Sequence, residues 1–240
     1  MIDLSRSRIL IGEENLNRLK QSTAAIFGLG GVGGYALEAI VRSGIGSVII
    51  ADYDRAAASN INRQILSLSS TMNCMKTDIA LKRIKDINPE INVTVISDRL
   101  TEKNISGIIP LKENIYAIDA IDEIDAKTSL IAELVNRKIP FVSSMGAGSR
   151  LDPTKVRVDD ISKTEYCPLA KTMRKRLRAI GINSGVRCIY SIETARETAS
   201  QIHEPEFDAG KRIQGSISFM PGIFGLMAAG IIINDIIKTN

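Results

Sequence analysis

The feature that most restricts the fold is a glycine-rich turn between a short apolar run and a segment with helical spacing, in the stretch IFGLGGVGGYALEAI at residues 26–40. Glycines at positions 28, 30, 31 and 33 follow the pattern G-x-G-G-x-G. Such glycines let a phosphate approach the backbone at the amino end of a helix, where N–H groups and the helix dipole favour an anion. The turn therefore predicts a nucleotide phosphate site, although glycine-rich turns also serve tight packing of a helix on a strand.

Short β-rich runs alternate with segments of helical spacing along most of the chain, which is typical of βαβ units and a parallel sheet. We expect strands at 24–29, 47–51, 91–96, 115–118, 140–143, 155–158 and 186–192, and helices at 5–22, 75–87, 124–138, 168–179 and 217–233. The predicted fold class is α/β: a Rossmann-like, doubly wound, mostly parallel sheet with an N-terminal helix and a C-terminal α/β extension.

The length of 240 residues suits one domain. Within it we expect an N-terminal helix (1–20), a nucleotide-binding core (21–150) and a C-terminal extension (151–240). The polar stretch near 196–215 has no periodicity and is expected to be a mobile loop.

The stretch 217–233, ISFMPGIFGLMAAGIII, has no charged residue and reaches the lower limit for a membrane span. Pro221 and the glycines at 222, 225 and 230 favour a buried core helix entered through a turn. No stable membrane insertion is therefore expected.

The three cysteines, Cys74, Cys167 and Cys188, are far apart and form no C-x-x-C pair. We therefore expect reduced thiols, with no disulfide and no structural zinc. The N-terminus lacks the basic start and apolar run of a secretory signal. A cytoplasmic location is expected from these two features.

Polar and charged residues after the second predicted strand favour a triphosphate over a redox dinucleotide. Asp52 lies where an acid can hold ribose hydroxyls. Asn60, Arg63 and Gln64 follow the same strand, and Lys76 lies near the start of the next helix. Arginines and lysines beyond the helix end would counter a third phosphate, with bidentate arginine contacts fixing its geometry. The alternative for each cation is a solvated surface position.

The combined motifs resemble the adenylating superfamily of ubiquitin-activating enzymes and the bacterial adenylyltransferases of thiamine and molybdopterin sulfur carriers. They comprise G-x-G-G-x-G, D-x-D at 52–54, S-N-x-x-R-Q at 59–64, a lysine opening a helix before INP, and D-x-x-D at 119–122. Residue 73 is Asn where members of this superfamily usually have Gly. The resemblance implies an ATP-binding site and a homodimer, and it leaves a sulfur-transfer protein open as a further partner.

The resemblance also assigns roles to single residues. It implies that Asp122 holds magnesium, which prefers few protein ligands, or polarises the site. It also implies that Arg6 reaches an ATP site, which in a dimer is that of the neighbouring subunit, and Arg8 is the competing candidate. The expected catalytic residues are Arg6, Arg63, Lys76 and Asp122. The expected ATP-binding residues are Gly28, Gly30, Gly31, Gly33, Asp52, Asp54, Ser59, Asn60, Arg63, Gln64, Lys76 and Asp122.

The last third of the chain is similar to a narrower family, the bacterial tRNA threonylcarbamoyladenosine dehydratases. The similarity is carried by DDISKTEYCPLAKTMRKRLRAIGI at 159–182, VRCIYSIE at 186–193 and GSISFMPGIFGLMAAG at 215–230. These enzymes use ATP to cyclise the threonylcarbamoyl group of the adenosine next to the anticodon. Activation of a carboxylate followed by attack from the substrate's own carbamoyl needs no protein nucleophile, which fits a chain with a single histidine.

A basic run, KTMRKRLR at 171–178, independently favours an RNA partner. Together with a net charge of +4 it would attract phosphates in a salt-dependent way. The expected RNA-binding residues are Lys171, Arg174, Lys175, Arg176 and Arg178. A solvated helix face is the alternative interpretation.

Four other functions remain open from the residues alone. Adenylation of a sulfur-carrier or ubiquitin-like protein would use the same nucleotide motifs. A nicotinamide oxidoreductase, or a nucleotide sensor without catalysis, would leave the Arg63 and Lys76 charges without a purpose. Cys167 and Cys188 leave open that the chain belongs to the thioester-forming branch of the superfamily. Cys188, however, lies within the alternating pattern of a predicted strand and is expected in the core.

Overall fold

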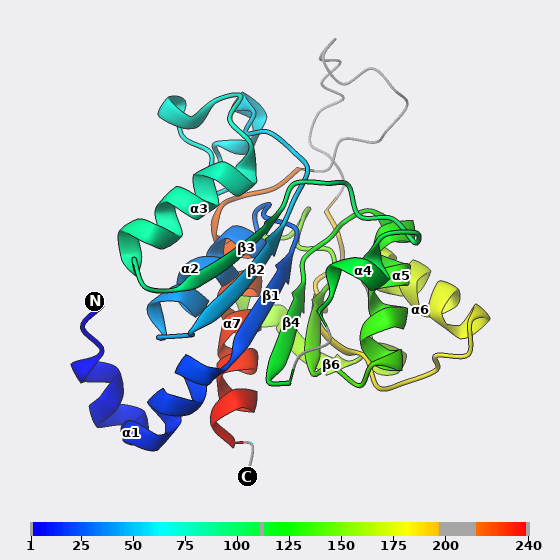
Figure 1. Cartoon of the computed structure of the whole chain (residues 1–240). Helices are drawn as coiled ribbons and strands as arrows, with labels where there is room; N and C mark the ends of the chain where they lie inside the picture. The colour runs from blue at the N-terminus through cyan, green and yellow to red at the C-terminus, as the bar shows by residue number, and fades with distance from the viewer. Residues whose placement is uncertain (1, 111–112, 197–214, 239–240) are drawn as a thin grey trace.

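The computed structural model describes residues 2–110, 113–196 and 215–238. Its strands form one sheet in the order β3-β2-β1-β4-β5-β7-β6 (Figure 1). They are β1 (Thr23–Phe27), β2 (Ser47–Ala51), β3 (Asn92–Ile96), β4 (Ile115–Asp119), β5 (Phe141–Ser144), β6 (Val156–Asp160) and β7 (Arg187–Ser191). All neighbouring pairs are parallel except β6 with β7. The predicted mostly parallel α/β fold is confirmed.

Helices cover both faces of this sheet (Figure 1). They are α1 (Ser5–Gln21), α2 (Gly33–Arg42), α3 (Lys76–Ile87), α4 (Ile105–Ile108), α5 (Ile124–Asn136), α6 (Pro168–Ala179) and α7 (Phe219–Lys238). One core cluster joins the sheet to α1, α2, α3 and α7. The other joins it to α4, α5 and α6. The two layers arise because strand residues alternate: in β1, Ala24 and Ile26 face the first cluster, and Ala25 and Phe27 face the second.

The order of the strands reverses beside β1. From β1 the chain adds β2 and then β3 on one side, and it returns to place β4 on the other side. In such open sheets ligands bind in the crevice at the carboxyl ends of the strands where the order reverses. The fold thus places the glycine-rich turn, which follows β1, at the expected site of binding.

Among the described residues, α7 is the one helix that is long and apolar enough to cross a membrane. Its most apolar stretch of 18 residues has a mean hydropathy of 1.7, and half of that stretch is buried. It packs against α2 and α1. A Cβ on Gly225 would lie 2.3 Å from the carbonyl oxygen of Val32, so this glycine allows α7 to approach the start of α2. The packing agrees with the predicted core helix.

Several local expectations differ from the structure. The short helix α4 was not predicted, because four residues carry too little periodicity to be recognised. The loop expected near 196–215 lies almost entirely outside the described residues. Asn73, at the position where glycine is usual, has φ of +64°, a backbone conformation that Asn tolerates better than most residues.

Candidate nucleotide and substrate site

A cavity of about 810 Å³ opens at the carboxyl ends of β1, β2, β4 and β5. It is lined at one end by the glycine-rich turn, residues 52–64 and Lys76, and at the other by residues 144–150 and the start of α6. Loops that follow parallel strands meet at this edge, so segments far apart in the sequence share one cavity.

Two glycines of the turn allow its tight geometry. Gly28 has φ of +88°, and a Cβ there would lie 2.7 Å from the carbonyl oxygen of Ala120. A Cβ on Gly33, the first residue of α2, would lie 1.7 Å from the carbonyl oxygen of Gly28. A side chain at Gly28 would push the turn away from the segment after β4, and one at Gly33 would clash with the turn itself. Gly28, Gly30 and Gly31 line the cavity, and the positive amino end of α2 faces it.

Asp52, directly after β2, is tied to the glycine-rich turn. Its Oδ2 accepts a hydrogen bond from the Leu29 N–H at 2.6 Å, and its Oδ1 accepts one from the Asp54 N–H at 2.8 Å. Burial raises the pKa of the Asp52 carboxyl above its usual value, although Lys76 and these two N–H groups act in the opposite direction. A carboxylate beside the turn can accept hydrogen bonds from ribose hydroxyls.

Two cations line the same end of the cavity. Lys76 is 4% exposed, and its Nζ lies 2.9 Å from Oδ2 of the half-exposed Asp54. Arg63 donates to the carbonyl oxygen of Ser59 at 2.7 Å and to Asn62 Oδ1 at 3.0 Å, and it has no carboxylate partner within the described part of the chain. The Arg63 charge is therefore available to an anionic ligand.

The short 3₁₀ helix Ala58–Asn60 orders the segment that carries Arg63. Asn60 lines the cavity and accepts from the Ala57 N–H at 3.2 Å, whereas Ser59 contributes its carbonyl oxygen to Arg63 and does not line the cavity. Gln64 is buried, and its Oε1 has no hydrogen-bond partner among the described residues. A buried acceptor without a partner indicates a ligand that donates to it.

Asp122 lies on the turn after β4 and faces the cavity with an exposed side chain. A buried ion pair holds this turn: Lys127 Nζ lies 2.8 Å from Asp119 Oδ2, and both side chains are fully buried. Lys127 also donates to the carbonyl oxygen of Ile121 at 3.0 Å, and Ser143 donates to Asp119 Oδ2 at 2.6 Å. Lys127 and Asp119 therefore connect β4, β5 and α5 to the backbone next to Asp122.

The opposite end of the cavity is lined by Ser144, the small residues 146–148, Arg150, and residues 167–169. Cys167 is buried here and precedes α6. Cys188 lies in β7, away from the lining, and burial raises the pKa of its thiol, as expected for a core cysteine. Arg150 and Lys127 were missed in the sequence because neither belongs to a local motif, and Asp119 was recognised only as the first residue of D-x-x-D.

The predicted RNA-binding residues on α6 divide into two groups. Lys171, Lys175 and Arg178 are exposed at helical spacing along one stripe, and Arg176 pairs with Asp125 at 3.3 Å. Arg174 instead donates to the carbonyl oxygens of Ile161 and Thr164 and to Thr164 Oγ1 at 2.6 Å. The guanidinium of Arg174 therefore holds the turn before α6, and its RNA contact stays a prediction.

Arg6 and Arg8 lie on α1 at the opposite end of the sheet from the cavity (Figure 1). Neither lines the cavity of its own chain. Arg8 pairs with Glu13 at 2.6 Å, whereas Arg6 is exposed. Within one chain the structure does not bring Arg6 to the other predicted site residues.

The family model for the ThiF family matches residues 4–240. The chain is 38% identical over 240 residues to the tRNA threonylcarbamoyladenosine dehydratase of Bacillus subtilis, covering 98% of this chain and 94% of the relative. It is 29% identical over 161 residues to the molybdopterin-synthase adenylyltransferase of Haemophilus influenzae, covering 67% and 65% of the two chains.

A solved structure gives the same result. The Escherichia coli tRNA N6-threonylcarbamoyladenosine dehydratase in complex with ATP superposes with a TM-score of 0.86 at 32% identity, covering 97% of this chain and 93% of that one. The family model, the sequence identity and the superposed structure thus agree. The chain belongs to the ThiF family, and within it the chain is similar over nearly its full length to tRNA threonylcarbamoyladenosine dehydratases.

Proposed function

We propose that this chain is an ATP-dependent tRNA threonylcarbamoyladenosine dehydratase. The observation that carries the proposal is one continuous cavity with two different ends. One end presents the glycine-rich turn, Arg63 and Lys76 to a nucleotide, and the other end is formed by the start of the basic helix α6. Such a cavity can bring an ATP phosphate and a nucleoside of bound RNA together. The likeness to the B. subtilis and E. coli dehydratases supports the same conclusion.

The reaction has two steps in which the atoms balance. A carboxylate oxygen of the threonyl group attacks the α-phosphorus of ATP, the bond to the β-phosphate oxygen breaks, and pyrophosphate leaves. The substrate's own carbamoyl group then attacks the activated carbonyl carbon, and AMP leaves with the former carboxylate oxygen. The carboxylic acid has already given up one proton on ionisation, the carbamoyl group gives up a second, and one carboxylate oxygen leaves on AMP. Relative to the free acid, the nucleoside thus loses the two hydrogens and one oxygen of water. The protein has to position and neutralise charge, and it needs no nucleophile of its own.

Arg63 and Lys76 both neutralise phosphate charge in the first step. Charge builds on the leaving pyrophosphate, and both cations lie at the end of the cavity beside the glycine-rich turn. Lys76 is held by Asp54, so its ammonium is in place before ATP binds. Asp52 accepts from the ribose hydroxyls, and Gln64 Oε1 and Asn60 offer further polar contacts.

Magnesium fits the donor set at Asp122. This carboxylate lines the cavity, and no described residue forms a hydrogen bond or ion pair with it. Magnesium is commonly held by one or two carboxylates together with phosphate oxygens and water. Among the described residues there is no cluster of three His, Cys, Asp or Glu side chains that would form a cage. Asp122 would hold the ion, which would neutralise phosphate charge.

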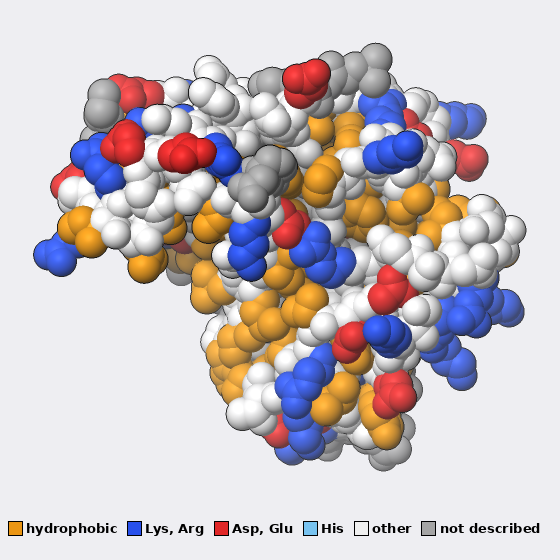
Figure 2. All heavy atoms as spheres, turned by 90° about the horizontal axis from the view of Figure 1, so that it is seen from below, with side chains coloured by type: hydrophobic (Ala, Val, Ile, Leu, Met, Phe, Trp, Pro, Cys, Tyr) orange, Lys and Arg blue, Asp and Glu red, His pale blue; other side chains and the backbone are white. Residues whose placement is uncertain are grey.

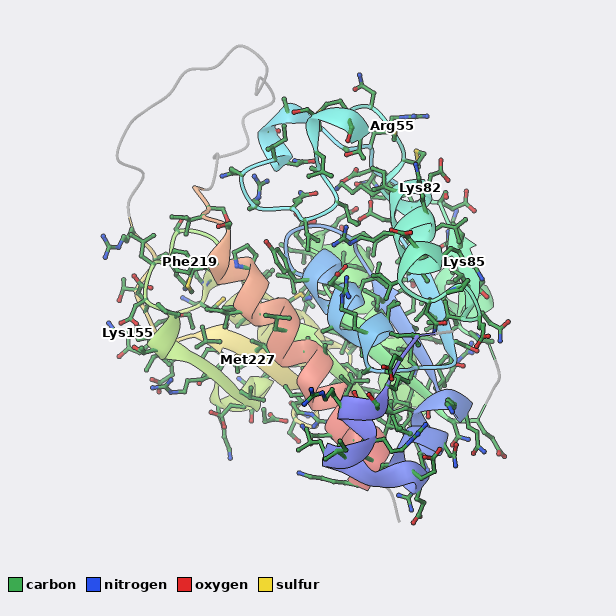
Figure 3. All side chains as sticks on the ribbon, turned by 90° about the vertical axis from the view of Figure 1, so that its left-hand side faces the viewer. Arg55, Lys82, Lys85, Lys155, Phe219 and Met227 are labelled. Carbon is green, nitrogen blue, oxygen red and sulfur yellow. The ribbon has the colours of Figure 1, made fainter. Side chains whose placement is uncertain are left out.

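We further propose that the chain acts as a homodimer. Arg6 is remote from its own cavity, while its neighbours Ile9 and Leu10 on α1 are 83% and 84% exposed. Hydrophobic side chains gather on the face on which α1 and the end of α7 lie (Figure 2). Phe219 and Met227 lie along α7, beside Lys155 (Figure 3). Large apolar side chains that are exposed next to one another favour an interface, and pairing would allow Arg6 to enter the partner's cavity.

The decisive experiment is an isotopic nucleoside assay. Purified protein is incubated with threonylcarbamoyl-modified tRNA, with and without ATP, and the nucleoside mass is measured. We expect loss of one water from the nucleoside only with ATP, together with release of AMP and pyrophosphate.

Pyrophosphate exchange that depends on a diglycine-ended carrier protein instead of tRNA would establish the alternative, a sulfur-carrier adenylyltransferase. The likeness to the molybdopterin-synthase adenylyltransferase is the observation that favours this alternative. A sulfur-transfer protein would then be the expected partner. The single-domain organisation and the cytoplasmic location remain predictions.

A further inference from the structure

The cavity contains a buried charge that the nucleotide end does not use. Arg150, on the segment after β5, is 2% exposed and is the largest of the fully buried side chains. It lines the end of the cavity formed by residues 144–148 and the start of α6. Arginine side chains are almost never fully buried unless they are paired, so the partner of this guanidinium has to be identified.

No carboxylate of the described residues pairs with Arg150. One Nη donates to the carbonyl oxygen of Gly148 at 2.6 Å, and the other lies 3.4 Å from the carbonyl oxygen of Tyr166. The Nε has no acceptor among the described residues. Two neutral carbonyl groups hold the side chain in place but do not cancel its charge. A buried positive charge, with no acceptor for its Nε among the described residues, therefore lines the cavity.

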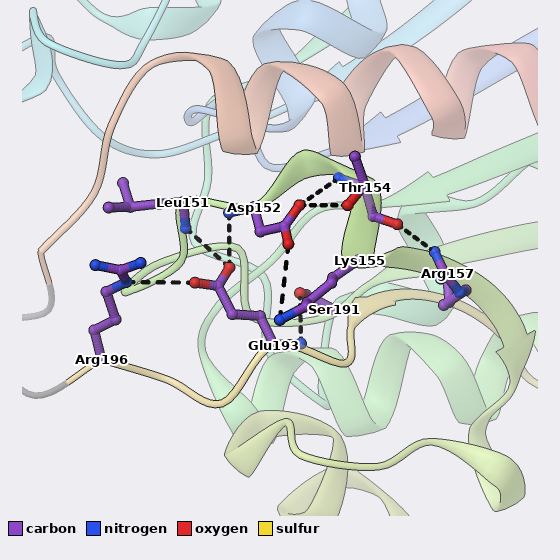
Figure 4. Close-up of polar contacts among 8 residues, drawn as sticks. All are labelled: Leu151, Asp152, Thr154, Lys155, Arg157, Ser191, Glu193 and Arg196. Carbon is purple, nitrogen blue, oxygen red and sulfur yellow. Dashed lines mark hydrogen bonds and ion pairs between the residues drawn. The ribbon is translucent and has the colours of Figure 1, made fainter.

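The nearby buried carboxylate is engaged elsewhere. Glu193 Oε2 accepts from the N–H groups of Leu151 and Asp152 at 2.9 and 2.8 Å, and its Oε1 lies 3.4 Å from Nε of Arg196 (Figure 4). Glu193 thus fixes the two residues that follow Arg150 and leaves the guanidinium without a carboxylate partner in the described part of the chain. The backbone is held firmly at the point where the free charge is presented, as in a preformed binding site.

A ligand for this position has to be an anion that reaches the inner end of the cavity. The ATP phosphates are already met by Arg63, Lys76 and the amino end of α2 at the other end. Phosphates of the RNA backbone are accessible to the exposed stripe of Lys171, Lys175 and Arg178. A carboxylate on a group that projects from a base can enter where the backbone cannot, and guanidinium binds carboxylate in a bidentate manner.

We propose that Arg150 binds the carboxylate of the modified nucleoside before it is adenylated. This inference rests on the proposed function and specifies the residue that recognises its substrate. The start of α6 lies at the same end of the cavity and adds the positive end of a helix dipole. Arg150 would hold the carboxylate within the same cavity as the phosphates of ATP and neutralise its charge as it leaves water.

The test compares two ligands on matched variants. The free nucleoside threonylcarbamoyladenosine and its uncharged carboxamide are used as inhibitors of tRNA dehydration, and binding of an uncleavable ATP analogue is measured in parallel. The variants are Arg150→Gln, Arg150→Lys and, as a control, Arg157→Gln. Arg157 is an exposed arginine of β6 that, among the described residues, donates only to backbone carbonyl oxygens.

The wild type and Arg157→Gln are expected to bind the acid about tenfold or more tightly than the carboxamide, the usual strength of a charge-assisted hydrogen bond. Arg150→Gln should lose this preference and Arg150→Lys should keep part of it, while all bind the ATP analogue equally, which shows that they are folded. The KM for modified tRNA should rise in Arg150→Gln.

An unchanged preference for the acid in Arg150→Gln, or no preference in the wild type, overturns the inference. If Arg150→Gln instead loses a preference for the nucleoside 3′-phosphate over the nucleoside, the residue binds an RNA phosphate and the carboxylate assignment is wrong. Failure of the proposed function is distinguishable from both, because the wild type then does not dehydrate modified tRNA with ATP.

Discussion

The protonation state of Asp52 makes both stability and ATP binding depend on pH. Its pKa is raised by burial above 3.8, the ordinary value for Asp. Because the pKa is higher in the folded than in the unfolded chain, the stability that this group contributes is present below the ordinary pKa and is lost as the pH rises through the raised value. ATP binding needs the ionised acceptor and therefore changes in the opposite sense.

We expect the affinity for an ATP analogue to fall on acidification at a pH above 3.8, earlier than an ordinary Asp would allow. Calorimetric titrations over a pH series would measure this, with Asp52→Ala to subtract the titration of the phosphates. A wild-type profile that runs parallel to that of Asp52→Ala would exclude Asp52 as the titrating group.

Arg63 combines a free guanidinium with purely local support, so its removal should affect activity more than stability. Arg63→Ala is expected to lower kcat at least about 100-fold, the usual effect of removing a donor to developing charge. Arg63→Lys should retain part of the rate, because it keeps the charge but loses the bidentate fork. Thermal melts should match the wild type, since Arg63 donates only to Ser59 and Asn62 among the described residues. Near-normal turnover in Arg63→Ala would remove this residue from the site.

At the scale of single elements, the contact between α7 and α2 can be tested with two glycines of one helix. A Cβ on Gly225 would lie 2.3 Å from the Val32 carbonyl oxygen, whereas a Cβ on Gly230 has no atom within 4 Å. We expect Gly225→Ala to lower the free energy of unfolding by about 2 kcal/mol. Gly230→Ala should raise it by up to about 1 kcal/mol through helix propensity.

Urea denaturation of both variants gives the two values. ATP binding should also weaken in Gly225→Ala, because Pro221 of α7 lies against Gly31. Equal stability of the two variants would mean that α7 can shift without cost.

Helix α6 begins at the cavity and carries the stripe of Lys171, Lys175 and Arg178 along its exposed side. Changing these three to Ala should weaken tRNA binding and reduce the slope of log K against log salt by about 1 for each RNA phosphate that is no longer neutralised. Filter binding over a salt series measures both. Binding of ATP should not change, and Lys82→Ala on α3 serves as the exposed control. A slope that stays constant would show that the stripe is only solvated.

On the scale of the whole molecule, the remote position of Arg6 makes a prediction about mixed dimers. Arg6→Ala and Arg63→Ala should each be inactive. After subunit exchange, random mixing makes half of the dimers mixed, each with one intact site, so about a quarter of the wild-type activity should return. If Arg6 served its own subunit, mixing would restore nothing. A protein that is monomeric by light scattering would contradict the dimer directly.

The parts of the fold that depend on local pattern could be predicted from the sequence. The buried strand SVIIA was placed at 47–51, as β2 is observed, because β-branched residues and the flanking turn residues indicate it locally. The placement of β7 between β5 and β6 could not be predicted. Pairing of distant strands depends on packing of the whole sheet and leaves no periodic signal in the chain.

The site divides in the same way. Residues 52–64 could be predicted because they follow one strand and stand close together in the sequence. Arg150 could not, because its importance comes from burial without a carboxylate, which no single segment encodes. One sequence signal points to this segment. The small residues 146–148 follow a predicted parallel strand, so they are expected at the same edge of the sheet as the glycine-rich turn.

The contact of Pro221 with Gly31 has a consequence for synthesis of the chain. A ribosome releases the glycine-rich turn long before it releases α7, so the nascent chain carries the nucleotide-contacting residues without the helix against which the turn rests. Domains fold as units once their last elements emerge. The turn therefore gains this support only after α7 has been synthesised and has docked against α2.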